Sequence, residues 1–261
     1  MNRPLQQSKS PNPWILYPAP NPNAKVRLFC LPYAGGGVQI FQNWHKSLPA
    51  EIELGLIQLP GRGRRFVDPL CTSVESMLQG LYPNFISELT KPYMLFGHSM
   101  GALLAFELIR LLRRQRNTLP VLFMPAGRCA PQLRDKEEMT HLLSDDLFRK
   151  KVAEMEGTPK EILANEELMN LLLPLLRADF QISEAYRYYE EAPLACEIIA
   201  FAGDQDKNNS VDDLKAWGEQ TTAAFETRIF SGGHFFIHSK EEELLTTLKQ
   251  IVNGFLQKMR L

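Results

Sequence analysis

The chain has 261 residues, of which 44% are hydrophobic and 23% charged, and its formal net charge is −1. This length and apolar content predict one large α/β domain, while the balanced charge argues against a nucleic-acid-binding protein. No apolar run reaches the roughly 18 residues of a transmembrane helix and the N-terminus lacks the apolar stretch of a secretory signal, so we predict a cytoplasmic protein without a membrane partner. The four cysteines show no ligand spacing, which argues against a metal site.

The N-terminal segment is rich in proline. Residues 1–25 contain six prolines and little hydrophobic periodicity, which predicts an irregular tail outside the core. We therefore expect residues 26–261 to form the α/β domain.

From residue 26 onward, short and nearly continuous apolar runs alternate with longer amphipathic ones, a pattern typical of parallel strands covered on both faces. The predicted strands are 26–33, 53–60, 93–99, 121–127, 196–203 and 226–233. The predicted helices are 74–89, 100–115, 211–220 and a C-terminal helix over 244–256. This alternation predicts a mostly parallel, doubly wound sheet.

The segment 131–193 interrupts the alternation, because it contains only helical patterns and is richer in Leu, Phe and Tyr than one helical face needs. Two interpretations are open: extra helices packed on the sheet edge, or an inserted helical lid that offers apolar surface to a substrate. We favour the lid, since ligands bind at the carboxyl ends of the strands in such sheets. Pro174 is predicted to break or kink this helical pattern.

The stretch GHSMG, residues 97–101, lies between a predicted strand and a predicted helix. A sharp strand-to-helix turn pushes a serine Oγ out of the sheet, and its neighbours must then be small. The Gly-X-Ser-X-Gly pattern alone is weak, but in this context it predicts Ser99 as a nucleophile.

A serine nucleophile on such a sheet needs an acid and a histidine, in that order along the chain. His234, after the last predicted strand, is favoured as the base over His238, while His98 is expected to point away from the serine and pack. In FAGDQDK (201–207), Asp206 is favoured as the acid over Asp204, which directly follows a glycine and can serve the turn. Three suitable residues, each at the carboxyl end of a predicted strand, predict a Ser-His-Asp triad.

An acyl-transfer site also needs N–H donors for the oxyanion that develops on the substrate. One predicted donor is the backbone N–H of Met100, directly after the nucleophile. The second is the N–H of Ala34 in LPYAGGGVQIF (31–41), where three glycines allow close backbone approach. A phosphate-cradling role for this loop is disfavoured, because no GKS or GKT follows and GxGxxG is absent.

Together these motifs resemble the type II thioesterases that accompany nonribosomal peptide and polyketide synthetases. The resemblance covers nearly the whole chain after the tail and rests on LPYAGGG, QLPGRGRR, FGHSMGALLAFEL, GDQDK and GGHFF. It implies an α/β-hydrolase fold, a triad of Ser99, Asp206 and His234, and a helical lid at 131–193. Lys207 departs from the pattern, because many relatives carry proline after the acid.

The resemblance also implies a reaction. An acyl group would be released from the phosphopantetheine arm of an acyl or peptidyl carrier protein through an acyl-serine intermediate, as editing of stalled or aberrant units. No cofactor is expected, and the protein is expected to be a monomer. The alternatives are a medium-chain fatty acyl thioesterase, which shares these landmarks, and a carboxylesterase acting on free small esters.

Arg62, Arg64 and Arg65 form a short basic cluster in PGRGRRF, after the second predicted strand. The cluster is either a solvated loop or a contact for the pantetheine phosphate or an acidic carrier protein. The second hypothesis follows from its place at a strand end and from charge complementarity.

Overall fold

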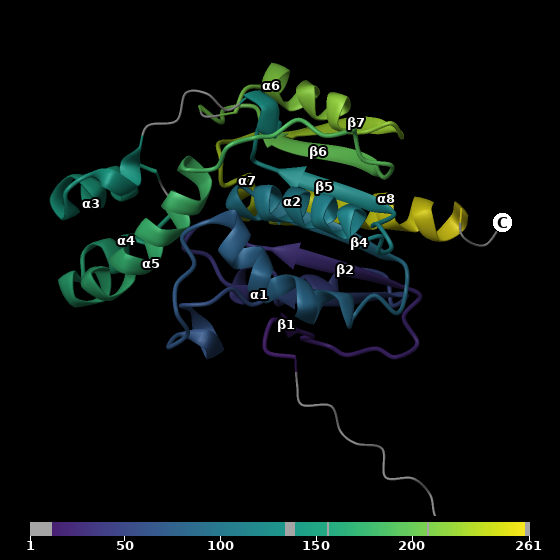
Figure 1. Cartoon of the computed structure of the whole chain (residues 1–261), viewed down its shortest axis with the longest axis horizontal. Helices are drawn as coiled ribbons and strands as arrows, with labels where there is room; N and C mark the ends of the chain where they lie inside the picture. The colour runs from purple at the N-terminus through teal and green to yellow at the C-terminus, as the bar shows by residue number, and fades with distance from the viewer. Residues whose placement is uncertain (1–11, 134–138, 156, 208, 259–261) are drawn as a thin grey trace, which may run out of the picture.

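The computed structural model describes residues 12–133, 139–155, 157–207 and 209–258. Its centre is a seven-stranded sheet in the order β1-β3-β2-β4-β5-β6-β7 (Figure 1). The strands are β1 (Ile15–Leu16), β2 (Val26–Leu31), β3 (Ile52–Ile57), β4 (Tyr93–His98), β5 (Leu122–Ala126), β6 (Glu197–Gly203) and β7 (Phe225–Phe230). β1 pairs antiparallel with β3 and every other pair is parallel, so the predicted fold class is confirmed.

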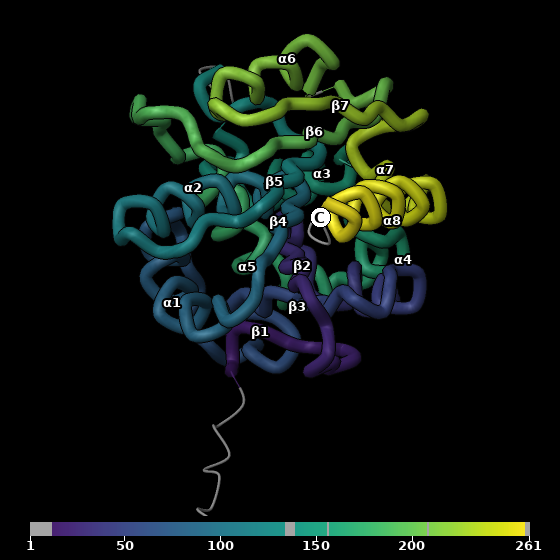
Figure 2. The backbone as a smooth tube through the Cα atoms, turned by 90° about the vertical axis from the view of Figure 1, so that its right-hand side faces the viewer, coloured from purple at the N-terminus to yellow at the C-terminus, as the bar shows by residue number. Residues whose placement is uncertain are grey.

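The helices cover the two faces of the sheet or lie beyond the carboxyl ends of its strands. They are α1 (Val74–Ile86), α2 (Met100–Arg114), α3 (Asp145–Glu154), α4 (Lys160–Leu163), α5 (Glu166–Glu184), α6 (Val211–Lys215), α7 (Phe236–Ser239) and α8 (Glu241–Lys258). Single 3₁₀ turns lie at Val38–Ile40, Trp44–Lys46, Gly63–Arg65, Pro131–Leu133, Thr140–Leu142 and Ala216–Gln220. Figure 2 shows α1 and α2 on one side of the sheet and α8 on the other. Each predicted strand and helix outside 131–193 is therefore found, with ends that differ by a few residues.

Two apolar cores lie between the sheet and these helices. Phe85 of α1 and Phe106 of α2 belong to one core, and Leu248 of α8 belongs to the other. β4 lies in the middle of the sheet between β2 and β5, covered on both faces, which explains why its sequence is almost continuously apolar. None of the helices in the described part of the chain has the length and apolarity needed to cross a membrane.

The predicted irregular tail, residues 1–25, is corrected in part. Residues 1–11 lie outside the described residues, but Ile15 pairs with Ile57 of β3 and Trp14 packs into the core beside α1. A two-residue strand gives no periodicity that a sequence pattern could reveal.

The segment between β5 and β6 carries α3, α4 and α5, which lie beyond the carboxyl ends of the strands (Figure 1). Residues 134–138 and 156 of the predicted 131–193 insertion lie outside the described residues. The segment has a small apolar core of its own, formed by Phe148, Val152, Met169, Leu173 and Leu176. That it acts as a lid stays a prediction.

Helix α5 continues through Pro174, so the predicted break is wrong, and the alternative, a kink, stays a prediction. Proline removes one helical hydrogen bond at a cost of about 3 kcal/mol. Leu173 and Leu176, on either side of Pro174, are both buried, and their packing offsets this loss. Leu171 is more than half exposed, so some of the many apolar side chains of this helix lie in the core and others lie at the surface.

Candidate active site

Ser99 alone connects β4, which ends at His98, to α2, which begins at Met100. Its backbone has φ 53° and ψ −114°, a conformation that L-residues other than glycine rarely adopt. Although Ser99 stands at the N-cap position of α2, its side chain makes no capping hydrogen bond. The predicted strand–turn–helix is present, and its serine hydroxyl takes no part in holding the helix.

The glycines on either side of Ser99 are required by close packing. A Cβ at Gly97 would lie 2.3 Å from the carbonyl oxygen of Gly101, and one at Gly101 would lie 2.2 Å from the carbonyl oxygen of Leu31. Any side chain at either position would push α2 away from β4 and β2. The motif therefore sets how tightly the helix carrying the turn sits on the sheet.

Asp206 and His234 meet across two loops. The Nδ1 atom of His234 lies 2.7 Å from Oδ2 of Asp206, whose side chain is fully buried, whereas the histidine side chain is 20% exposed. The loops after β6 and β7 are joined by a backbone hydrogen bond from Gln205 N–H to the Gly232 carbonyl, 2.8 Å long. The pair is therefore built into the carboxyl edge of the sheet with one face of the imidazole accessible.

The second carboxylate of this loop has a different partner. Oδ1 of Asp204 accepts the backbone N–H of Gly232 at 2.9 Å, so Asp204 holds the turn that leads to His234. Of the two aspartates considered from the sequence, Asp206 is the one that contacts the imidazole.

Asn209 is a residue of this site that the sequence analysis missed. Its Nδ2 donates to Oδ2 of Asp206 at 3.0 Å, and its Oδ1 accepts the N–H of Cys129 at 2.7 Å. The residue is 6% exposed. It thus supports the carboxylate oxygen that also bonds His234. Its only signal in the sequence is an amide three residues after the acid, which is too common to be informative.

His98 packs rather than bonds. The residue is fully buried, and its ring lies edge-on to those of His234 and Phe236, with centroid distances of 5.2 and 5.5 Å. Burial lowers the pKa of His98 well below its ordinary value, so the ring stays neutral. Because His98 directly precedes Ser99 in the chain, its ring contact with His234 places the predicted base close to the predicted nucleophile.

His238, the competing base, is engaged elsewhere. Its Nε2 atom and the hydroxyl of Tyr33 are joined by a 2.7 Å hydrogen bond. Burial lowers the pKa of His238 and raises the pKa of Tyr33 to about 12, so both groups are neutral near pH 7. This bond links the loop after β2 to α7, next to the predicted oxyanion donor Ala34.

The two predicted oxyanion donors have no competing acceptor. Neither Ala34 N–H nor Met100 N–H donates a hydrogen bond to a described residue. Met100 is the first residue of α2, where the helix dipole favours negative charge. The loop carrying Ala34 is held by a turn in which Gly36 N–H donates to the Tyr33 carbonyl at 2.9 Å.

The arginine cluster does not act as a unit, because Arg62 and Arg65 bind partners within the protein. Arg62 forms a two-pronged ion pair with the buried Asp179 of α5, and removing one partner of such a pair typically costs about 3–5 kcal/mol. Arg65 stacks on the Trp14 ring at 3.7 Å and bonds Asp68. Arg64 is exposed and makes no ion pair with any described residue, so it alone fits a contact with an anionic partner.

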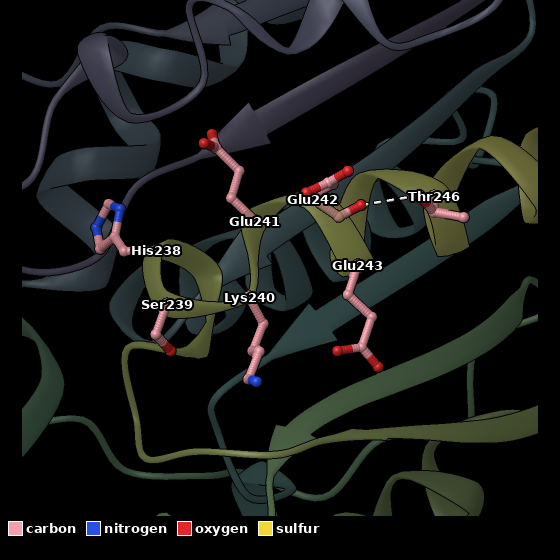
Figure 3. A pocket seen from close by; sticks show the side chains of 7 residues that line it. All are labelled: His238, Ser239, Lys240, Glu241, Glu242, Glu243 and Thr246. Carbon is pink, nitrogen blue, oxygen red and sulfur yellow. Dashed lines mark hydrogen bonds between the residues drawn. The ribbon is translucent and has the colours of Figure 1, made fainter.

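A surface pocket of about 580 Å³ lies at the start of α8 (Figure 3). Its lining residues are His238, Ser239, Lys240, Glu241, Glu242, Glu243 and Thr246, and the Thr246 hydroxyl bonds the Glu242 carbonyl. It contains none of the predicted triad, and its three glutamates make it a poor place for an anionic substrate. Across the described ranges, no group of three or more His, Cys, Asp or Glu side chains is arranged to hold a metal ion.

Comparisons with known proteins identify the family of this chain. The thioesterase domain model matches residues 26–252. "Linear gramicidin dehydrogenase LgrE" of Brevibacillus parabrevis is 42% identical over 95% of both chains. "Gramicidin S biosynthesis protein GrsT" of Aneurinibacillus migulanus is 38% identical over 90% of this chain and 91% of its own.

A solved structure agrees as well. That of the type II thioesterase BorB from the borrelidin biosynthetic cluster superposes with a TM-score of 0.82 at 32% identity, covering 91% of this chain and 96% of its own. The protein therefore belongs to the thioesterase family, in its type II branch, and has the α/β-hydrolase fold.

Proposed function

We propose that this thioesterase hydrolyses acyl groups from the phosphopantetheine arm of carrier proteins, through a triad of Ser99, His234 and Asp206. The observation that carries the proposal is the 2.7 Å contact between His234 and the buried Asp206, in a chain whose Ser99 occupies a strained strand-to-helix turn. We infer a thioester substrate from membership in the thioesterase family.

The proposed reaction has two halves. Nε2 of His234 takes the proton of Ser99 as its Oγ attacks the thioester carbon, and the N–H groups of Ala34 and Met100 bind the resulting oxyanion. Collapse breaks the C–S bond, the pantetheine sulfur receives the proton, and an acyl-Ser99 ester remains. Water, deprotonated by the same histidine, then releases the carboxylic acid and restores the serine. Asp206 stabilises the imidazolium formed in each half.

The proposed role is editing of stalled or aberrant acyl units in nonribosomal peptide or polyketide biosynthesis. It is supported by the relatives, whose names refer to gramicidin and borrelidin biosynthesis. Although one relative is named a dehydrogenase, the dinucleotide fingerprint GxGxxG does not occur in this sequence. The partners would be acyl or peptidyl carrier proteins, and a cytoplasmic location stays a prediction.

A substrate comparison tests the proposal. We expect kcat/KM for an acetylated carrier protein to exceed that for p-nitrophenyl acetate by about 100-fold or more, because contacts with the carrier contribute binding energy. The acetyl thioester of N-acetylcysteamine is the control that separates thioester chemistry from carrier recognition. Equal or higher kcat/KM on the free ester would favour the carboxylesterase alternative, and a strong preference for longer fatty acyl chains would favour the medium-chain one.

Arg64 provides a second test. Substitution Arg64→Gln is expected to raise KM for the carrier-bound substrate about 2- to 5-fold, because an exposed charge pair contributes little more than this. The KM for the N-acetylcysteamine thioester should not change. Arg116→Gln, an exposed arginine at the far end of α2, is the matched control. An equal rise in KM on both thioesters would argue against a carrier contact.

A further inference from the structure

Asp179 is a buried carboxylate of α5, with its side chain 1% exposed. It reaches out of the helical segment to the loop that follows β2. Its Oδ2 accepts the backbone N–H of Gly35 at 2.7 Å and Nη1 of Arg62 at 2.6 Å. Its Oδ1 accepts Nη2 of Arg62 at 2.8 Å. Neither oxygen is left without a donor, as burial of a charged group requires.

Arg62 extends the same network to two further backbone groups. Its Nη1 also donates to the Gly36 carbonyl at 3.0 Å and its Nε donates to the Pro60 carbonyl at 3.1 Å. The carboxylate and the guanidinium thus join three segments that are distant in sequence: α5, the glycine-rich loop after β2 and the loop after β3. A planar guanidinium suits this role, because its donors point in fixed directions.

The contact falls on the residue next to the proposed oxyanion donor. Gly35 follows Ala34 directly and has φ +76°, and Cδ2 of Leu176 occupies the space that a side chain at Gly35 would need. The bond to Asp179 fixes the Ala34–Gly35 peptide plane with its N–H directed toward α5. The Ala34 N–H belongs to the preceding peptide, and the bond restrains it by holding the backbone on the other side of the Ala34 Cα. The Ala34 N–H, which has no acceptor among the described residues, remains available for the substrate.

We propose that Asp179, paired with Arg62, is the positioning residue of the oxyanion loop, and that it ties the helical segment to the floor of the active site. This inference rests on the proposed thioesterase mechanism, because it assigns Asp179 the task of holding Ala34 N–H in place. Displacement of a donor by a fraction of an ångström weakens its bond to the transition state while leaving substrate binding largely unchanged. Variants at Asp179 therefore act on kcat rather than on KM.

The test is Asp179→Asn, which keeps the shape of the side chain but places an amide nitrogen against an N–H donor. We expect kcat for an acetylated carrier protein to fall about 10- to 100-fold with KM unchanged within about 2-fold. Affinity for a trifluoromethyl ketone analogue, whose hemiketal oxygen occupies the proposed oxyanion site, should fall in parallel with kcat. A purely structural role would not move that affinity.

Glu184→Gln is the matched control. Glu184 is also a buried carboxylate of α5, and it accepts the backbone N–H and Nδ1 of His141 instead of the glycine-rich loop. We expect this variant to lower the melting temperature without lowering kcat. An unchanged kcat in folded Asp179→Asn, or equal losses of kcat in the two variants, would overturn the proposal.

Arg62→Lys decides the matter if Asp179→Asn does not fold. Lysine keeps the positive charge but cannot make the two-pronged contact with Asp179. A lower kcat with unchanged KM in this variant would support the proposal, and a wild-type kcat would overturn it. Failure of the proposed function is recognised separately, because the wild-type protein would then lack thioesterase activity before any variant is compared.

Discussion

Ser99→Ala is expected to lower kcat for thioester hydrolysis about 10⁴-fold or more while the protein stays folded. In the proposed mechanism the activity depends on the Oγ atom as the nucleophile. The fold does not, because that hydroxyl makes no capping bond to α2 and alanine tolerates the same backbone conformation about as well as serine. Steady-state kinetics and thermal unfolding of the same preparation measure both effects.

Ser73→Ala is the matched control, since Ser73 also stands at a helix N-cap. There the Oγ accepts the N–H of Ser76 at 3.1 Å and completes a capping box at the start of α1. We expect this substitution to cost about 1 kcal/mol of stability and to leave kcat unchanged, the opposite of the result at Ser99. Full activity in a folded Ser99→Ala protein would rule out an acyl-serine intermediate.

Asp206→Asn is expected to lower kcat about 10³-fold or more, with little change in KM. Asparagine removes the negative charge that stabilises the imidazolium of His234 when it takes the serine proton. Because Asp206 is fully buried and its Oδ2 is shared by His234 and Asn209, no water-exposed carboxylate can substitute for it. Single-turnover measurements of acyl-enzyme formation would show the loss at the chemical step itself.

Asp204→Asn provides the comparison within the same loop. The asparagine oxygen can still accept the Gly232 N–H, so we expect kcat to stay within about 3-fold of wild type. If Asp204→Asn lost more activity than Asp206→Asn, the acid of the triad would have been assigned to the wrong carboxylate.

The order of elements could be predicted from the sequence because it depends on local patterns. Most of the strands from β2 to β6 are nearly continuous apolar runs because they are covered on both faces, whereas the edge strand β7 (FETRIF) is mostly polar and partly exposed. The helices α1, α2 and α8 show helical periodicity, since each is buried on a defined face. β1 was missed for the same reason. Ile15 and Leu16 are too few to form a pattern in a proline-rich segment. They form a strand because they pair with β3 and because Trp14 next to them is packed in the core.

The sequence by itself determined the strand–turn–helix around Ser99 and the chain order of the proposed nucleophile, acid and base, because the carboxyl ends of parallel strands lie at one edge of the sheet. Only the tertiary structure decided which neighbours support them. Arg62 and Asp179 are separated by 117 positions, and nothing local distinguishes their pairing from a solvated arginine and a helical aspartate. The same holds for Asn209 behind Asp206. A buried charge or amide finds its partner through the packing of segments distant in sequence, so its role becomes visible only when those segments are in contact.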